Sequence, residues 1–170
     1  MAQDAATKSK AKSNAVVFGG VAFVWLVLDY LTKQAANTAQ VGDLLWSGIP
    51  GFIDFRLVHN TGAAWGMFGD STFALGVFAI VFCAILLVIA HVRREHAGTL
   101  EMVGYGLVLA GGIGNAIDRF TNSYVVDFIE TTFIQFPVFN VADIGVTCGF
   151  ALIVISYFLL EGNDKDSEDR

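Results

Sequence analysis

Long apolar stretches alternate with short polar segments along this chain, and four of the apolar stretches have the length of a membrane span. They cover residues 16–28, 71–90, 102–117 and 144–160. The second stretch carries no charge and has about the 20 residues that the hydrocarbon core of a bilayer requires. Polar residues gather at the ends of the stretches instead of in their middles. The pattern predicts an integral membrane protein, mainly α-helical, with four transmembrane helices.

The first 13 residues are polar and basic, and they precede the first apolar stretch. A basic start before an apolar core is also typical of a cleaved signal peptide, but no small-residue cleavage site follows it here. We therefore expect a disordered cytoplasmic segment at 1–13, a single membrane domain at 14–161 and an acidic cytoplasmic tail at 162–170.

Lysine and arginine are distributed unevenly between the two ends of the predicted spans. Seven of the ten fall on the side of the termini, namely Lys8, Lys10, Lys12, Arg93, Arg94, Lys165 and Arg170. Because positive residues concentrate in cytoplasmic segments, we expect both termini in the cytoplasm. The connections 34–70 and 118–140 are then expected to face outward.

The first outward connection is too long to be a simple linker. Within it Ile53, Phe55 and Leu57 alternate with other residues at the period of two that indicates a β-strand. Aromatic side chains that suit the headgroup level of a bilayer are Trp46, Trp65 and Phe68. We expect a small extracytoplasmic β-sheet between the first and second helices, in an outer subdomain of about 40–68.

The composition is that of a membrane protein and excludes a nucleic-acid-binding surface. Hydrophobic residues make up 55% of the chain, and its mean hydropathy is +0.60. The net charge of −6 comes largely from the tail, where five acids lie between Glu161 and Arg170. No basic patch of the kind that binds nucleic acid is present. Cys83 and Cys148 lie in apolar stretches and are expected to be small buried hydrophobes.

The histidines do not form a metal site. His59 lies in an outward connection, whereas His91 and His96 lie on the cytoplasmic side, so they cannot share an ion. The His-Glu-x-x-His pattern of zinc peptidases does not occur in the sequence. We therefore expect no metal and no other cofactor.

Polar residues stand at helical spacing at the outward ends of three spans. The pairs are Asp29 and Lys33, Asn115 and Asp118, and Asn140 and Asp143. Spacings of three or four place both members on one helix face. Asp29 and Lys33 are expected to form an ion pair that supports a helix end. Asn140 and Asp143 resemble a helix cap, and Asp118 with Arg119 resembles an interfacial pair, so each also has a purely structural interpretation.

Asp127 is harder to explain as a structural residue, because β-branched and aromatic residues surround it in the segment 124–129. Such surroundings disfavour the ionised form of a carboxyl group and raise its pKa. If Asp127 lies near Asp143, the two carboxyls would share one proton, as in aspartic proteases. The ionised member, which we take to be Asp143, would then activate a water molecule.

Two other chemistries remain open at this point. A Ser–Lys hydrolase would need the one outward lysine, Lys33, and a serine such as Ser47, Ser71 or Ser123, none of which lies in a nucleophile motif. A small proton-coupled transporter subunit would line its pathway with aspartates, but the middles of the later spans are nearly free of ionisable groups.

Five motifs in order make the chain resemble bacterial lipoprotein signal peptidases, the type II signal peptidases. They are Asp29-Tyr30-Leu31-Thr32-Lys33, Asn60-Thr61-Gly62-Ala63-Ala64-Trp65, Gly112-Ile113-Gly114-Asn115-Ala116-Ile117-Asp118-Arg119, Val125-Val126-Asp127-Phe128-Ile129 and Phe139-Asn140-Val141-Ala142-Asp143. The resemblance covers about residues 15–160 and implies a multi-pass aspartic endopeptidase of the bacterial inner membrane. Such enzymes remove the signal peptide from diacylglyceryl-modified prolipoproteins, just before the lipidated cysteine.

The resemblance also implies a role for each matched polar residue. Asp127 and Asp143 would form the catalytic dyad, and Asp29 and Lys33 would support the end of the first helix. Residues that would position the substrate and orient the dyad are Asn60, Asn115, Asp118, Arg119 and Asn140. The implied partners are the diacylated prolipoprotein and membrane lipids, with no nucleic acid and no metal.

Overall fold

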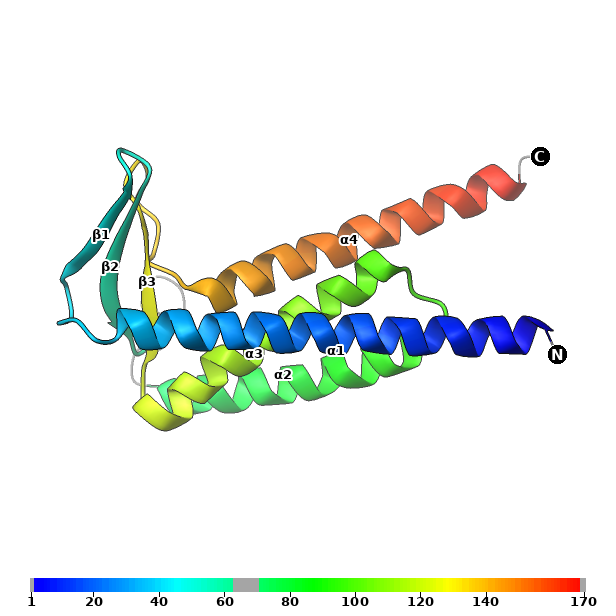
Figure 1. Ribbon diagram of the computed structural model, residues 1–170, viewed down its shortest axis with the longest axis horizontal. Helices are drawn as coiled ribbons and strands as arrows, with labels where there is room; N and C mark the ends of the chain where they lie inside the picture. The colour runs from blue at the N-terminus through cyan, green and yellow to red at the C-terminus, as the bar shows by residue number, and fades with distance from the viewer. Residues whose placement is uncertain (1, 63–70, 169–170) are drawn as a thin grey trace.

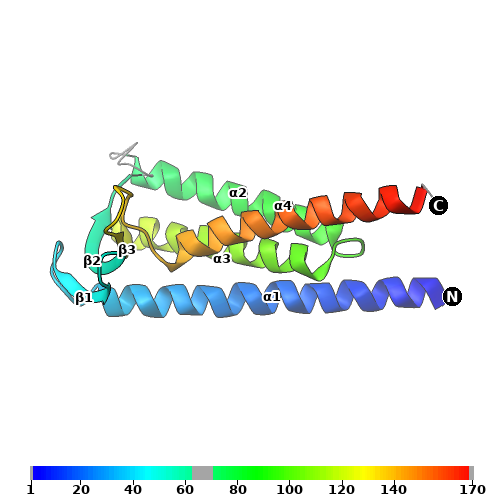
Figure 2. The same cartoon turned by 90° about the horizontal axis from the view of Figure 1, so that it is seen from above.

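Four long helices form the body of the protein in the computed structural model, which describes residues 2–62 and 71–168. They are α1 (Ala2–Ala36), α2 (Thr72–Arg93), α3 (Thr99–Asn122) and α4 (Val141–Glu168). Each contains a window long and apolar enough to cross a membrane, as the sequence predicts. Both termini lie at one end of the bundle, and a small sheet lies at the other (Figure 1; Figure 2).

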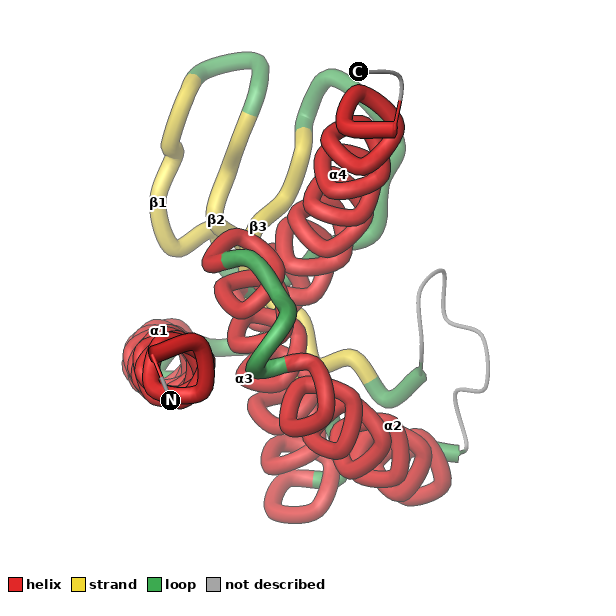
Figure 3. Tube along the Cα trace, turned by 90° about the vertical axis from the view of Figure 1, so that its right-hand side faces the viewer, coloured by secondary structure: helices red, strands yellow, loops and turns green. Residues whose placement is uncertain are grey.

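Helix α3 lies at the centre of the bundle and packs against each of the other three helices (Figure 3). Glycines allow this close packing. A Cβ atom at Gly111 would collide with the carbonyl oxygen of Ala142, and one at Gly114 would collide with Asp29 Oδ2. Small residues therefore bring the backbones of α1 and α4 close to α3, and with them the polar residues of these helices.

The sheet has three antiparallel strands in the order β1 (Leu44–Ile49), β2 (Ile53–Asn60) and β3 (Val125–Thr131). The strand expected around residue 53 is thus confirmed. The expected sheet, however, was confined to the first outward connection, whereas β3 comes from the second. In the register Val58 pairs with Asp127 and Asn60 pairs with Val125. The second connection therefore joins the sheet and brings Asp127 to the helix ends.

A layer of apolar side chains holds the sheet against the helices. Leu57, Val126 and Phe128 are buried there, and they pack with Ala36 at the end of α1 and with Ile144 of α4. Alternation along β2 directs Leu57 inward, as the period of two predicts. The sheet is consequently fixed to the polar ends of the spans.

The segment 2–13 differs from the expected disorder, because it is part of α1. Lys10 Nζ donates to His96 O at 3.1 Å, and Asn14 Nδ2 donates to Arg94 O at 2.8 Å and to Ala97 O at 3.0 Å. These contacts tie the start of α1 to the connection between α2 and α3. Trp65 and Phe68, which we expected near the headgroup level, lie outside the described residues.

Candidate active site

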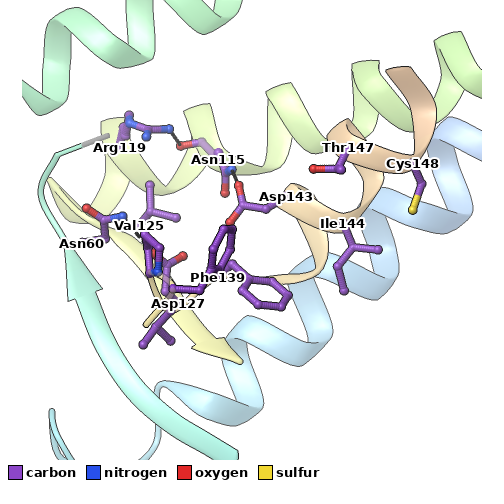
Figure 4. Close-up of a pocket in the computed structure, with 13 residues that line it drawn as sticks. Asn60, Asn115, Arg119, Val125, Asp127, Phe139, Asp143, Ile144, Thr147 and Cys148 are labelled. Carbon is purple, nitrogen blue, oxygen red and sulfur yellow. Dashed lines mark hydrogen bonds between the residues drawn. The ribbon is translucent and has the colours of Figure 1, made fainter. Parts of the chain in front are cut away.

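The polar residues singled out in the sequence meet at the end of the bundle that carries the sheet. A cavity of about 440 Å³ is lined there by Asn60, Asn115, Arg119, Asp127 and Asp143, together with apolar residues. These side chains come from β2, β3, α3 and α4 (Figure 4). The structure therefore joins residues that are more than 80 positions apart in the chain, Asn60 and Asp143.

Asp127 lies in β3 and is only 2% exposed. Ser123 ends α3 in a left-handed conformation (φ 64°), and this turn directs the chain into the strand. Asn140 Nδ2 donates to Asp127 Oδ1 at 2.7 Å, and Asn60 Nδ2 donates to Asp127 Oδ2 at 2.9 Å. Burial, and secondarily the nearby charge of Asp143, raises the pKa of Asp127 to about 7, although the two amide donors oppose the shift.

Asp143 lies in the first turn of α4, where a carboxylate interacts favourably with the helix dipole. Asn115 Nδ2 donates to its Oδ1 at 2.8 Å, and Asn140 N donates to its Oδ2 at 3.1 Å. In return Asp143 N donates to Asn140 Oδ1 at 3.0 Å. The predicted helix cap is thus confirmed, in the reciprocal form of a capping box.

Every carboxyl oxygen of Asp127 and Asp143 accepts one N–H hydrogen bond from an asparagine residue. Asn140 contacts both acids, because its backbone N–H reaches Asp143 while its side-chain nitrogen reaches Asp127. This arrangement holds two carboxyls beside one cavity. The asparagine donors favour the ionised carboxylates, whereas the burial of Asp127 and the charge of Asp143 disfavour a state in which both acids are ionised. The site is therefore suited to two acids that share a proton.

Lys33 is almost fully buried next to Asn115, which lines the cavity, and its Nζ atom contacts three oxygen atoms. Its Nζ lies 2.9 Å from Asp29 Oδ2, 3.2 Å from Asp118 Oδ2 and 2.9 Å from Asn115 Oδ1. The expected ion pair of Asp29 with Lys33 is confirmed, as is the common face of Asn115 and Asp118. The Ser–Lys route gains no support, because the Nζ atom of Lys33 is engaged by two carboxylates and an amide oxygen.

The same acids extend the cluster to β3 and α4. Ala142 N donates to Asp29 Oδ1 at 2.8 Å, and Val126 N donates to Asp118 Oδ2 at 3.1 Å. The two donors, Ala142 and Val126, directly precede the candidate acids Asp143 and Asp127 in the chain. The cluster around Lys33 therefore fixes the backbone on which both catalytic candidates stand.

Arg119 does not pair with Asp118, contrary to the interfacial pair considered from the sequence. Its Nη1 donates to Asn115 O at 3.2 Å, and its Nη2 donates to Gly62 O at 3.4 Å. Its Nε is buried and has no hydrogen-bond partner within the described part of the chain. The guanidinium group thus borders the cavity with unused donor capacity.

Sequence reasoning missed three contributors to the site. Phe139 pairs with Ile129, whose N donates to Phe139 O at 2.8 Å, and so holds β3 beside α4. Thr147 and Cys148 line the cavity one turn beyond Asp143. Cys148 is exposed, which corrects the expectation of a buried hydrophobe, whereas Cys83 is buried as expected. Helical spacing from Asp143 is the sequence signal that would have identified Thr147.

Comparisons with known proteins point to one family. Residues 21–159 match the family model described as "Signal peptidase (SPase) II". A lipoprotein signal peptidase of Microcystis aeruginosa is 39% identical over 81% of this chain and 89% of its own length. One of Staphylococcus haemolyticus is 36% identical over 86% and 92%.

The fold is also found among solved structures. A structure titled "Bacterial membrane enzyme structure by the in meso method at 2.3 A resolution" superposes with a TM-score of 0.76 and is 31% identical. The alignment covers 84% of this chain and 88% of that one. By the length of the matched segment, the identity and the shared fold, the chain belongs to the signal peptidase II family.

Proposed function

We propose that Asp127 and Asp143 are the catalytic dyad with which this signal peptidase II hydrolyses a diacylglyceryl-modified prolipoprotein, just before its lipidated cysteine. The observation that carries the proposal is the joint arrangement of the two acids. They come from different elements, border one cavity and are both bound by Asn140. Burial of Asp127 supplies the acid that stays protonated near neutral pH.

In the proposed reaction Asp143 is ionised and Asp127 is protonated. Asp143 takes a proton from a water molecule, whose oxygen attacks the scissile carbonyl carbon. Asp127 transfers its proton to the carbonyl oxygen, so that a neutral tetrahedral diol forms. When the C–N bond breaks, Asp143 returns its proton to the leaving amine and Asp127 recovers a proton from the diol, which restores the starting state.

The remaining polar residues position the reactants. Asn60, Asn115 and Asn140 hold the carboxyl oxygens, and the guanidinium group of Arg119 borders the cavity, where it would contact the substrate. Asp118, with Asp29 and Lys33, supports this set from behind. Nothing favours the transporter alternative, since the dyad and the Lys33 cluster are gathered at one end of the bundle.

The dyad is tested by cleavage of a diacylated prolipoprotein peptide in detergent. We expect Asp127→Asn and Asp143→Asn each to lower kcat at least ~10³-fold, because each variant lacks one of the two acids whose proton transfers the reaction needs. Thermal denaturation checks that both variants are folded. Asp43→Asn, an exposed aspartate of the sheet end, is the matched control and should retain wild-type activity. Activity in either dyad variant would refute the assignment.

We also propose that the protein lies in the bacterial inner membrane with both termini in the cytoplasm and the dyad at the outer face. The excess of Lys and Arg near the termini supports this orientation. A fluorescent protein fused after Arg170 should fluoresce in cells, whereas alkaline phosphatase fused at Thr132 should be active only if that connection is outside. The reverse result at both sites would invert the orientation.

A further inference from the structure

Two asparagines beside Asp127 cannot turn their amides freely, because a group that can only donate holds each side-chain oxygen. Asn60 Oδ1 accepts from Gly62 N at 3.0 Å, and Asn140 Oδ1 accepts from Asp143 N at 3.0 Å. A backbone N–H group can only donate a hydrogen bond. The side-chain oxygen must therefore face it, and the amide nitrogen must point elsewhere. In both residues the nitrogen points to a carboxyl oxygen of Asp127.

The third asparagine, Asn115, is held by the charge of a buried lysine. Lys33 Nζ donates to Asn115 Oδ1 at 2.9 Å, and Asn115 Nδ2 donates to Asp143 Oδ1 at 2.8 Å. Asn140 Nδ2 adds a second, uncharged donor to the same Asn115 oxygen at 3.0 Å. A charged donor binds an amide oxygen more strongly than a neutral one, and it polarises the amide so that its own N–H donates more strongly.

We propose that Lys33 is a positioning residue of the hydrolysis, which acts on Asp143 through Asn115: it fixes the Asn115 amide and strengthens the hydrogen bond that this amide donates to the Asp143 carboxyl. This inference rests on the proposed function of the dyad. Lys33 makes no hydrogen bond or ion pair with Asp127 or Asp143 within the described residues, so its hydrogen-bonded connection to Asp143 passes through Asn115. Its charge also acts through space on Asp127, where it opposes the rise in pKa. An ammonium group has three N–H donors, and the one not used by Asp29 and Asp118 is directed at Asn115.

Charged side chains lie around the hydrogen bonds that join Lys33, Asn115 and Asp143, and they come from each of the packed elements. They are Asp29 and Lys33 of α1, Asp118 and Arg119 of α3, Asp127 of β3 and Asp143 of α4. Removal of Lys33 alone would leave two buried carboxylates without their cation, which endangers folding. The triple variant Asp29→Asn/Lys33→Met/Asp118→Asn avoids this problem, because each asparagine keeps an oxygen for the backbone N–H of Ala142 or Val126.

The test measures kcat, KM and the pH profile of kcat/KM for a diacylated prolipoprotein peptide, with the full-length enzyme in detergent. Lys33→Met and the triple variant are compared with the wild type. We expect kcat to fall ~10-fold and KM to change less than ~2-fold, with the acidic limb of the profile moved up by about half to one pH unit. A purely structural role would reduce the fraction of active enzyme and leave the acidic limb in place.

Two further variants sharpen the comparison. Asn115→Leu removes both the oxygen that Lys33 contacts and the donor to Asp143 without adding a charge, so it should move the acidic limb in the same direction. Glu101→Gln is the matched control, because it neutralises an equally buried carboxylate of α3 that is bound to Arg93 at the opposite end of the bundle. Glu101→Gln should leave the acidic limb of the pH profile unchanged.

The outcomes separate this inference from the dyad itself. A Lys33 variant with a wild-type thermal transition and a wild-type acidic limb overturns the role of Lys33, provided that Asp127→Asn and Asp143→Asn are inactive. If Asp143→Asn remains active, the dyad is wrong and the inference fails with it. If Glu101→Gln moves the limb as far as the triple variant does, the effect is one of buried charge in general, and the inference is also overturned.

Discussion

At the scale of single residues, the side chain of Asn140 both caps a helix and binds one of the two proposed catalytic acids. From the sequence these were alternative interpretations of the same motif. In the structure the side-chain oxygen caps α4 while the side-chain nitrogen binds Asp127. The residue is completely buried, so each of its polar atoms needs a partner. The cap and the dyad therefore form one hydrogen-bonded unit.

Asp127 should make the stability of the protein depend on pH. Its pKa is about 7 in the folded protein, against 3.8 for an ordinary, solvent-exposed aspartate. Between these two values the folded protein keeps a proton that the unfolded chain has released, so the free energy of unfolding falls as pH rises through this window. The loss amounts to as much as about 4 kcal/mol.

Thermal denaturation in detergent at pH 5 and pH 8 measures this effect. The wild type should have the lower Tm at pH 8, and Asp127→Asn should show a much smaller difference because it has no proton to lose. An equal drop in Tm for both proteins would show that other groups cause the pH dependence. The same titration predicts that cleavage declines as pH rises above about 7, since Asp127 then loses the proton that the reaction uses.

At the scale of the elements, the close approach of α3 and α4 determines where the dyad lies. Gly111 faces the carbonyl oxygen of Ala142, the residue that precedes Asp143. Any side chain at this position would push the first turn of α4 outward. The packing of two helices is thus coupled directly to the position of one carboxyl group.

Substitution of Gly111 by alanine should therefore reduce both stability and activity. We expect a loss of about 1–3 kcal/mol and a lower kcat, because the added methyl group meets backbone instead of a movable side chain. Gly20→Ala in α1 is the matched control, as nothing lies within 4 Å of its Cβ position. It should be neutral or slightly stabilising. Equal Tm values for both variants would contradict this account.

At the scale of the whole molecule, the two ends of the bundle have different tasks. The end with the sheet holds the proposed dyad, whereas the end with the termini is closed by hydrogen bonds from α1 to the connection between α2 and α3. Buried polar residues occur at both ends, with Glu101 bound by Arg93 and Tyr105 at the second. Only the first end carries two acids beside a cavity of about 440 Å³ in the described part of the chain.

Loss of Asn14 should accordingly affect stability without affecting chemistry. Asn14→Ala removes the donor for Arg94 O and Ala97 O and should cost about 1–3 kcal/mol. At a temperature where the variant is folded, its kcat should equal that of the wild type. Lys12→Ala, at an exposed position two residues earlier, should change neither property. A reduced kcat in folded Asn14→Ala would show that the two ends are coupled.

Local pattern alone was sufficient to predict the helices, one strand and several of the polar residues that the structure brings to the cavity, whereas the site roles of Asn60 and Arg119 came from the family resemblance. Apolar length sets the four spans, because a bilayer accepts only segments that satisfy their own backbone. Helical spacing placed Asn115 with Asp118, and Asn140 with Asp143, on common faces. A carboxyl group among apolar residues costs free energy when it is ionised. For this reason the sequence alone predicted a functional role for Asp127.

Contacts between distant segments were decided only by the tertiary structure. The sequence did not reveal that residues 125–131 pair with β2, since strand pairing depends on partners that lie far apart in the chain. Nor did it reveal the helical start of α1, which is held by carbonyl groups of another connection. The orientation of each amide, and the path from Lys33 through Asn115 to Asp143, follow from atoms of α1, α3, β3 and α4 that meet only when the bundle is packed.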